Sequence, residues 1–189
     1  MTLAIVLGSA QGVFQEVAEA MRLCQPDMII AVNDMIPAWP DALHAAVSFH
    51  AEKMRHWLRR RQMNGYSIPQ GVVIPSEWPE WYQVLHKDKL DFEPTLQTPY
   101  RFDGQDESGS SGLFAVKVAL VDYGVDRVIC CGMPMEPDVR YQHRHRRWYS
   151  AIRHRKGWEQ SREQLRNVRS MSGWTADFLG RPSRQWCLR

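Results

Sequence analysis

An α/β sandwich built on a mostly parallel sheet is the fold that the sequence predicts, and two observations predict it. Short, continuous apolar runs alternate along the chain with segments in which apolar residues recur at helical spacing. Most of these runs end in a glycine or a polar residue, as strands do where they enter a loop. Because strands that alternate with helices form parallel sheets covered on both faces, we expect a three-layer architecture.

Three short apolar runs predict the strands of the N-terminal half: residues 3–8 (LAIVLG), 28–32 (MIIAV) and 45–49 (AAVSF). Residues 13–23 and 51–65 carry apolar side chains at helical spacing and predict two amphipathic helices. We expect the second helix to end at Gly65, because glycine readily adopts the left-handed backbone conformation of a helix C-cap.

The C-terminal half continues this alternation after one long interruption. Residues 71–75 (GVVIP) predict a fourth strand, whereas residues 76–108 show no periodicity and predict a long irregular connection with one short helix at most. Residues 112–124 then predict a helix, and residues 127–133 predict a strand. Near the C-terminus, residues 167–180 predict a short strand that runs into a short helix.

The composition is that of a soluble globular protein. A length of 189 residues suits one domain over residues 1–189, and the hydrophobic share of 44% is enough for a sizeable core. No apolar run approaches the ~20 residues that span a bilayer, so we expect no membrane partner. The first apolar run has no basic leader before it, which predicts a cytoplasmic location.

The cysteines and histidines do not form a convincing metal site. None of the four cysteines has the C-x-x-C spacing of a zinc or redox site. Cys130 and Cys131 lie in a predicted strand, where we expect them to be small buried hydrophobes. His143 and His145 form an H-x-H pair without a nearby carboxylate or cysteine, which is a weak ligand set. The sequence therefore predicts neither a metal nor a cofactor.

A segment of small residues, 108–112 (SGSSG), lies directly before the predicted helix of the C-terminal half. The first amides of a helix lack partners within it, and the helix dipole places about half a positive charge there. Glycine lets an anion approach these amides, and Ser110 and Ser111 add hydroxyl donors, so the segment fits a phosphate. The alternative is that one of the serines only caps the helix.

Two other strand ends carry candidate binding residues. Residues 8–12 (GSAQG) form a glycine turn but lack the motifs of dinucleotide-binding sites and P-loops, so close packing explains these glycines equally well. Asn33 can read a base or ribose through its amide, or it can be a plain turn residue. Because carboxyl ends of parallel strands share one edge, we expect Gly8, Asn33, His50 and Ser110 around one cleft.

These motifs resemble those of the bacterial sialyltransferase-like Rossmann group, which includes CMP-sialic-acid-dependent glycosyltransferases and related domains of unassigned function. The matching stretches are IVLGSAQG, IIAVND, AAVSFH and SGSSGLFAVKVALVDYGVDRVICCGMPM. The resemblance implies a Rossmann-like sandwich that binds a CMP-type nucleotide or nucleotide sugar. By resemblance the nucleotide-binding residues are Gly8, Ser9, Asn33, Ser110, Ser111, Gly112 and Gly132. It also places His50 where the family has a polar residue facing the donor sugar.

The segment 136–169 is rich in basic residues, and around residues 140–156 cations alternate with aromatic side chains. This pattern suits phosphate contacts and base stacking, and it leaves three alternatives: a solvated helix face, a nucleic-acid surface, or an electropositive lid over a nucleotide. If a glycosyl group leaves a phosphate without a metal, cations and hydroxyls must stabilise the charge. The candidates for that role are Arg140, Tyr141, Arg144 and Arg146.

The leading functional hypothesis is a nucleotide-sugar-binding protein whose activity, if it has one, is metal-independent glycosyl transfer. A general base would be a histidine or carboxylate beside the acceptor hydroxyl. The candidates are His50, His143, His145 and Asp34. The alternative is a nucleotide- or nucleic-acid-binding protein that keeps the scaffold without glycosyl transfer. A third hypothesis is an interaction module that docks a partner on the tryptophans of residues 76–82 (SEWPEWY).

Overall fold

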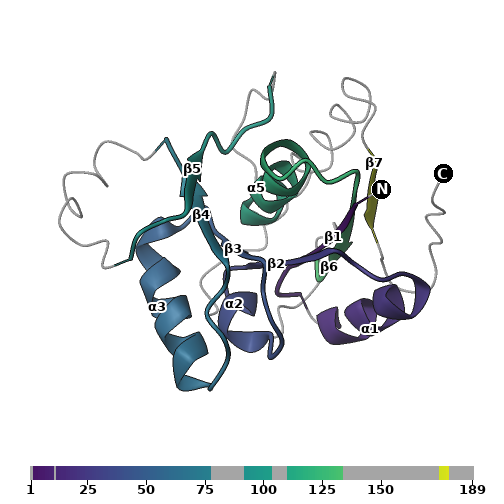
Figure 1. The fold of residues 1–189 in the computed structure, drawn as a ribbon, viewed down its shortest axis with the longest axis horizontal. Coiled ribbons are helices and arrows are strands. Elements are labelled where there is room, and N and C mark those ends of the chain that lie inside the picture. Colours follow the sequence, from purple (N-terminus) through teal and green to yellow (C-terminus); the bar gives the residue numbers. More distant parts are fainter. Residues whose placement is uncertain (1, 11, 78–91, 104–109, 134–174, 179–189) are drawn as a thin grey trace, which may run out of the picture.

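A computed structural model describes residues 2–10, 12–77, 92–103, 110–133 and 175–178 of the chain. Its centre is a seven-stranded sheet in the order β5-β4-β3-β2-β1-β6-β7, in which every neighbouring pair is parallel (Figure 1). The strands are β1 Leu3–Leu7, β2 Met28–Val32, β3 Ala45–Val47, β4 Gly71–Pro75, β5 Leu96–Thr98, β6 Arg127–Cys131 and β7 Thr175–Phe178. The predicted α/β class with a parallel sheet is confirmed.

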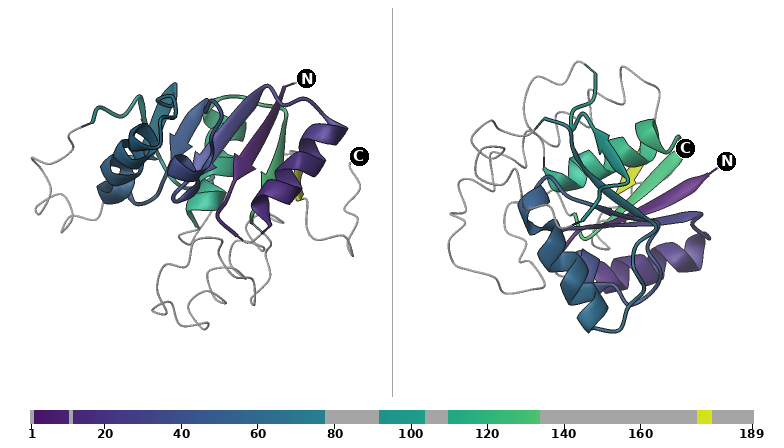
Figure 2. Two further views of the ribbon diagram at one scale, coloured as in Figure 1. Left: turned by 90° about the horizontal axis from the view of Figure 1, so that it is seen from below. Right: turned by 60° about the vertical axis from the view of Figure 1, so that its left-hand side comes forward.

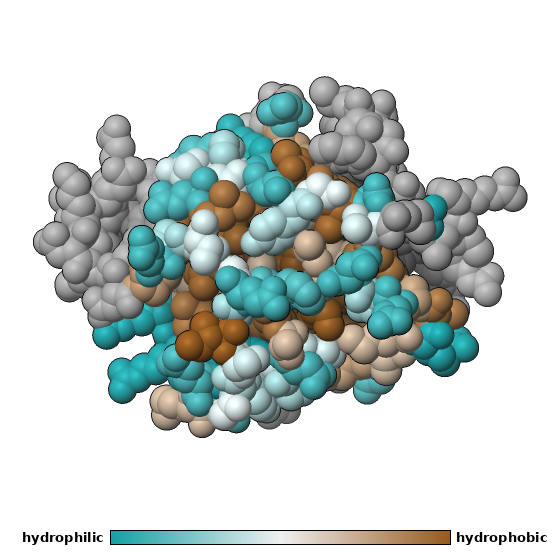
Figure 3. Space-filling view, in the orientation of Figure 1, coloured by the Kyte–Doolittle hydropathy of each residue, from teal (hydrophilic) through white to brown (hydrophobic). Residues whose placement is uncertain are grey.

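Helices cover both faces of the sheet, which completes the three layers. They are α1 Val13–Leu23, α2 Met35–Ala38, α3 Ala51–Met63 and α5 Ser111–Lys117, the last of which continues as a π-helical segment over Val118–Asp122. Helices α1, α2 and α3 lie on one face and α5 lies on the other (Figures 1 and 2). The hydrophobic residues of the described surface lie mainly toward its middle, with hydrophilic residues toward its margins (Figure 3).

Alternate residues of the same strands form the two halves of the core. Ala4 and Val6 of β1 pack with α5 on one face, whereas Ile5 and Leu7 pack with α1 and α2 on the other. Because both faces are covered, the strands are continuous apolar runs rather than alternating ones. This is why strands β1 to β4 and β6 were recognisable in the sequence.

The order in which successive strands are added to the sheet reverses at β1. From β1 it proceeds strand by strand to the β5 edge, and it then returns through α5 to β6 on the other side of β1. The carboxyl ends of β1 and β6 therefore flank a topological switch point, the place where open α/β sheets usually bind ligands.

Two short elements differ from the sequence expectation. Strand β5 lies within the segment 76–108, which was predicted to be an irregular connection with one short helix at most. It has only three residues at the edge of the sheet, and Pro99 follows it directly, so no period could reveal it. Helix α2, which has four residues and includes Pro37, was not predicted either.

The helix boundaries match the sequence expectations closely. Helix α1 spans the predicted residues. Helix α3 ends in a Schellman motif, in which the N–H of Gly65 donates to the carbonyl of Gln62 and the N–H of Tyr66 donates to that of Arg61. Gly65 has a φ of 78°, as expected for a glycine C-cap. Residues 167–180 were predicted to form a short strand that runs into a short helix; β7 lies in the later part of this stretch, and its other residues lie outside the described ones.

Candidate functional site

The glycine turns after β1 and β6 lie against each other at the switch point. The Gly8 N–H donates to the carbonyl of Cys131 at 2.7 Å, and the Ala10 N–H donates to that of Gly132 at 3.0 Å. A Cβ atom on Gly8 would overlap the carbonyl oxygen of Gly132, and a Cβ on Gly132 would overlap that of Gly8. Both glycines are therefore required by close backbone packing, whatever else they bind.

The turn after β6 is further fixed by α1. Glu16 of α1 accepts a hydrogen bond from the Gly132 N–H at 2.6 Å. Gly132 has a φ of 70°, which is in the left-handed region that favours glycine. This role of Glu16 was not recognisable from the sequence pattern, because a glutamate in the first turn of a helix is common.

We expect Gly132→Ala to lower the free energy of unfolding by about 2 to 5 kcal/mol, because the strained φ contributes about 1 to 2 kcal/mol and overpacking about 1 to 3 kcal/mol. Gly124→Ala is the matched control, since Gly124 also has a positive φ, 64°, but no atom lies within 4 Å of its added Cβ. Urea unfolding followed by circular dichroism measures both. Equal losses in the two variants would show that the Gly8 contact contributes nothing.

The second group of site residues is centred on Ser48, which is fully buried and directly follows β3. Its hydroxyl donates to Asn33 Oδ1 at 2.7 Å and accepts from the His50 N–H at 2.9 Å. Asn33 directly follows β2 and has a φ of 52°, the left-handed conformation that asparagine tolerates better than most residues. Ser48 therefore fixes the orientation of the Asn33 amide.

The start of α5 joins the same group. Ser111 is buried, and its hydroxyl accepts from the Phe49 N–H at 3.2 Å. Ser110 is the N-cap, because its hydroxyl accepts from the Leu113 N–H at 3.2 Å. Ser110 therefore caps the helix, and this bond uses its hydroxyl oxygen as an acceptor only. Each hydroxyl retains its own proton for donation.

Met133 connects the two groups. Its thioether lies over the Cα of Gly112, and its Cγ lies beside Gly8. The structure therefore brings Gly8, Gly112 and Gly132 together around Met133. It brings Asn33, His50 and Ser111 together around Ser48 and Phe49. Ser9 is half-buried beside Gly8.

His50 has a carboxylate partner that the sequence did not reveal. Its Nδ1 lies 3.2 Å from Glu52 Oε1, in the first turn of α3. Burial raises the pKa of the Glu52 carboxyl, but the hydrogen bond with His50 and nearby positive charge outweigh burial and bring this pKa below its usual value. The imidazole is therefore held beside an ionised carboxylate. In the sequence, the signal for this pair was a histidine and a glutamate two residues apart at a strand-to-helix turn.

Asp34 also lies at this edge, where its carboxylate accepts a hydrogen bond from the Trp57 indole N–H at 2.9 Å. The other candidates from the sequence cannot be placed. His143, His145, Arg140, Tyr141, Arg144 and Arg146 all belong to the basic segment 136–169, which lies outside the described residues. The same holds for the tryptophans of residues 76–82.

The cysteines of β6 behave as core residues, as expected. Cys130 and Cys131 are buried, and burial together with the charge of Glu16 raises the pKa of the Cys131 thiol far above its usual value. Cys131 is therefore an uncharged thiol rather than a nucleophile. In the described part of the chain, no three metal-ligating side chains come together. None of the helices described there is both long and apolar enough to cross a bilayer.

Comparison with known proteins gives one informative match. No protein-family model matches the sequence. No curated protein matches it either. Among solved structures, the fold is similar to the sialyltransferase CST-II in complex with a trisaccharide acceptor and CMP. The TM-score is 0.58 at 10% identity, over 96% of this chain and 82% of the other. The chain therefore shares the Rossmann-like α/β fold of that structure.

Proposed function

We propose that this protein binds a nucleotide sugar of the CMP type at the carboxyl edge of its sheet and transfers the sugar without a metal. The observation that carries the proposal is the hydrogen-bonded chain from Asn33 through Ser48 and Phe49 to Ser111, which unites the ends of β2 and β3 with the start of α5. The fold that it shares with a sialyltransferase supports the same assignment.

Asn33 is the residue best suited to recognise the nucleotide. Because Ser48 donates to its Oδ1, the Nδ2 group of Asn33 carries two N–H donors that no acceptor occupies among the described residues. Asn33 is only partly buried where it follows β2 at the carboxyl edge of the sheet, so a ligand there can reach its side chain. A base carbonyl or a ribose hydroxyl is the acceptor that such an amide fits.

The phosphate is proposed to lie at Ser110, Ser111 and Gly112. Ser110 is exposed and keeps a hydroxyl proton for donation, and the space over Gly112 is filled by the flexible Met133 side chain. A ligand at Gly112 therefore displaces Met133. Met133 therefore covers the proposed phosphate position while no nucleotide is bound.

His50 is proposed as the general base. With Nδ1 directed at Glu52, Nε2 is the nitrogen that accepts a proton from an acceptor hydroxyl. The hydroxyl oxygen bonds to the anomeric carbon while the bond from that carbon to the phosphate oxygen breaks. The resulting phosphate charge is met by Ser110 and by the basic side chains Arg140 and Arg144 of the C-terminal segment.

Asn33→Asp is the sharpest test of the site, because the acid keeps the Oδ1 acceptor for Ser48 and loses both N–H donors. We expect it to weaken CMP binding at least tenfold, since a hydrogen bond in a binding site contributes roughly 1 to 3 kcal/mol. Calorimetric titration with CMP measures the affinity. Thermal unfolding is expected to change little.

The control is Gln62→Glu, which makes the same amide-to-acid change at an exposed position of α3 and should bind CMP as the unmodified protein does. Equal affinity in Asn33→Asp and the unmodified protein would show that the nucleotide lies elsewhere. If the unmodified protein binds no nucleoside phosphate or nucleotide sugar, the proposed function is wrong. A thermal-shift screen decides this, because a ligand at a hundred times its Kd adds about 2.7 kcal/mol of stability.

A further inference from the structure

Helix α3 concentrates positive charge on the side that faces away from the sheet. Its exposed basic side chains, which we call the basic face, are Lys53, Arg55, His56, Arg59 and Arg60. The only acid of the helix is Glu52, which interacts with His50 and with Lys53. Helix α3 lies at the end of its layer farthest from α1, so its outer side meets no other described helix (Figures 1 and 2).

The basic face is one continuous surface. Residues three, four or seven apart lie on the same side of an α-helix. Arg55 and Arg59 are four apart, His56 and Arg60 are four apart, and Lys53 and Arg60 are seven apart. The buried residues of the helix occupy the opposite side, and they are Ala51, Met54, Trp57 and Arg61.

The stability of the helix does not explain this arrangement. Like charges four residues apart repel each other and destabilise a helix. The helix dipole favours cations near the C-terminal end, where Arg60 lies, but not near the N-terminal end, where Lys53 and Arg55 lie. Arg59 and Arg60 have no acidic partner in the part of the chain that the structure describes. Positive charge gathered against such repulsion is expected where it meets an anionic partner.

Two exposed apolar side chains border the basic face at its C-terminal end. Met63, the last residue of α3, is 77% exposed and lies four residues after Arg59, on the same side of the helix. Ile68 is 63% exposed, and the bond from Arg61 Nε to the carbonyl of Ser67 holds its segment against the helix. Cations bordered by exposed apolar side chains suit the boundary between lipid headgroups and acyl chains.

A lipid surface fits this combination better than a nucleic acid does, although both offer phosphates to the cations. Single-stranded nucleic acids stack on aromatic side chains, and none of the exposed residues between 52 and 68 is aromatic, since Trp57 is buried and Tyr66 is half-buried. A duplex presents charged phosphates along its outside, so Met63 and Ile68 would gain nothing from it. At a bilayer these two side chains leave water.

We propose that the basic face of α3, together with Met63 and Ile68, docks the protein on a membrane surface rich in anionic lipids. The apolar stripe of α3 stays in the protein core, so its cations contact the headgroups and the attraction is mainly electrostatic. The lack of a spanning segment made us expect no membrane partner, but attachment to the surface of a bilayer needs no such segment. This docking is independent of nucleotide binding at the carboxyl edge of the sheet.

Arg59→Glu with Arg60→Glu tests the docking by co-sedimentation with large vesicles. The anionic vesicles contain phosphatidylcholine with about one third phosphatidylglycerol, and pure phosphatidylcholine is the neutral surface. We expect the unmodified protein to bind only the anionic vesicles and to dissociate as salt rises from about 50 to about 500 mM. The partition constant should fall about tenfold or more in the double variant, because each basic residue at an anionic surface contributes roughly a fivefold factor.

A second double variant, Met63→Ser with Ile68→Ser, tests the apolar contact. It keeps every cation, and we expect its partition constant on anionic vesicles to fall about threefold or more. Unchanged binding of this variant would overturn the choice of a lipid surface, because only the apolar side chains distinguish lipid from other anionic partners.

The matched control is Arg22→Glu with Arg101→Glu, because both arginines are exposed, lie outside α3 and give the same change of net charge. Its partition constant should stay within about threefold of that of the unmodified protein. Circular dichroism checks the fold of each variant. Arg59→Glu should fold normally, because an acid four residues after Arg55 forms a favourable pair. Absence of binding to anionic vesicles, or an equal loss in the control, overturns the proposal.

Labelled duplex DNA and labelled poly-L-glutamate are the probes for the two other anionic partners, a nucleic acid and an acidic protein. We expect either probe to bind more weakly than anionic vesicles do. Tighter binding of one of them that is lost in Arg59→Glu with Arg60→Glu would assign the basic face to that partner and overturn the lipid docking. None of these measurements involves CMP, so their failure is distinct from a failure of the proposed function.

Discussion

Arg61→Met is expected to lower the free energy of unfolding by at least about 3 kcal/mol, because each buried acceptor left without a donor costs about 1 to 3 kcal/mol. Arg61 lies on α3, has no exposed surface, and donates to four backbone carbonyls. The acceptors are Ile36, Trp39, Asp41 and Ser67. Most small domains are stable by only about 5 to 15 kcal/mol, so this loss is a large share of the total.

Arg61 acts as an anchor for α2 and the chain that follows it. Two of its acceptors, Ile36 and Trp39, are the carbonyls at the end of this four-residue helix, which is too short to be stable alone. Burial lowers the pKa of the Arg61 guanidinium, but the usual value of this pKa is so high that the group stays charged. Its hydrogen bonds to described residues all go to backbone carbonyls, and Tyr66 and the Asp41 carboxylate add favourable electrostatic interactions that partly offset the effect of burial on this pKa.

Urea unfolding of purified Arg61→Met and Arg61→Lys measures the loss. We expect the lysine variant to recover little, because one ammonium has three donors and no planar fork to reach carbonyls from separate segments. Arg60→Met is the matched control at the neighbouring exposed position, where a change within about 0.5 kcal/mol is expected. An unfolding midpoint for Arg61→Met equal to that of Arg60→Met would contradict the anchoring role.

The fold was largely predictable because burial on both faces makes a parallel strand an unbroken apolar run. Helix α1 and strands β1 to β4 were recognised on that basis. Strand β5 was not, because it has only three residues. It pairs with β4, and the Thr95 hydroxyl just before it accepts from the Val72 N–H and donates to the Val72 carbonyl. An edge strand stabilised by long-range side-chain contacts has no local period.

The site was predictable only where its residues sit at strand ends. Asn33 and His50 were found this way, whereas Ser48 and Met133 were missed because their partners are distant in the sequence. Glu52 was missed although its partner His50 is only two residues away. Arg61 was not singled out in the amphipathic helix predicted over residues 51–65. Its spacing from the buried residues Met54 and Trp57 nevertheless places it on the apolar stripe of α3, which was the available signal.

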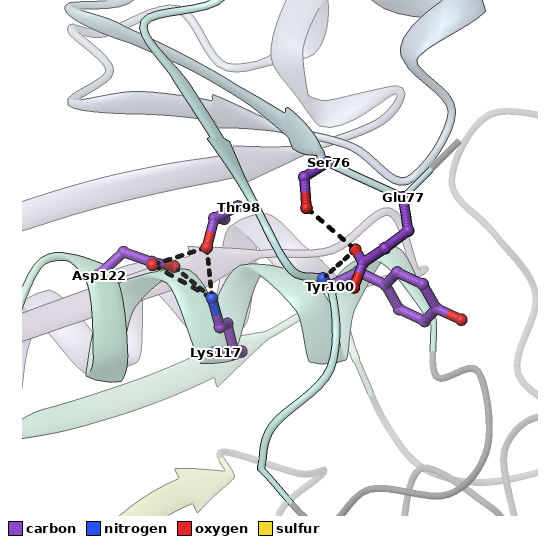
Figure 4. A network of polar contacts seen from close by, with 6 residues as sticks. All are labelled: Ser76, Glu77, Thr98, Tyr100, Lys117 and Asp122. Carbon is purple, nitrogen blue, oxygen red and sulfur yellow. Dashed lines mark hydrogen bonds and ion pairs between the residues drawn. The ribbon is translucent and has the colours of Figure 1, made fainter. Parts of the chain in front are cut away.

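A buried ion pair, Lys117 with Asp122, joins the end of α5 to the edge strand β5. Lys117 Nζ lies 2.9 Å from Asp122 Oδ2 and donates to the Thr98 hydroxyl at 2.6 Å, and this hydroxyl donates to Asp122 at 2.8 Å (Figure 4). The π-helical segment makes the pair possible, because its turn spans five residues, as in the bond from the Tyr123 N–H to the Val118 carbonyl. Residues five apart then lie on the same side of the helix.

Lys117→Met is expected to destabilise the protein by about 3 to 5 kcal/mol, because it leaves the Asp122 carboxylate in its mostly buried position without a counter-ion. The double variant Lys117→Met with Asp122→Leu should recover most of this loss, since a buried ion pair replaced by apolar residues is often neutral in stability. Urea unfolding of the two single variants and the double variant gives the coupling energy. A coupling below about 0.5 kcal/mol would show that the pair contributes no more than an exposed one.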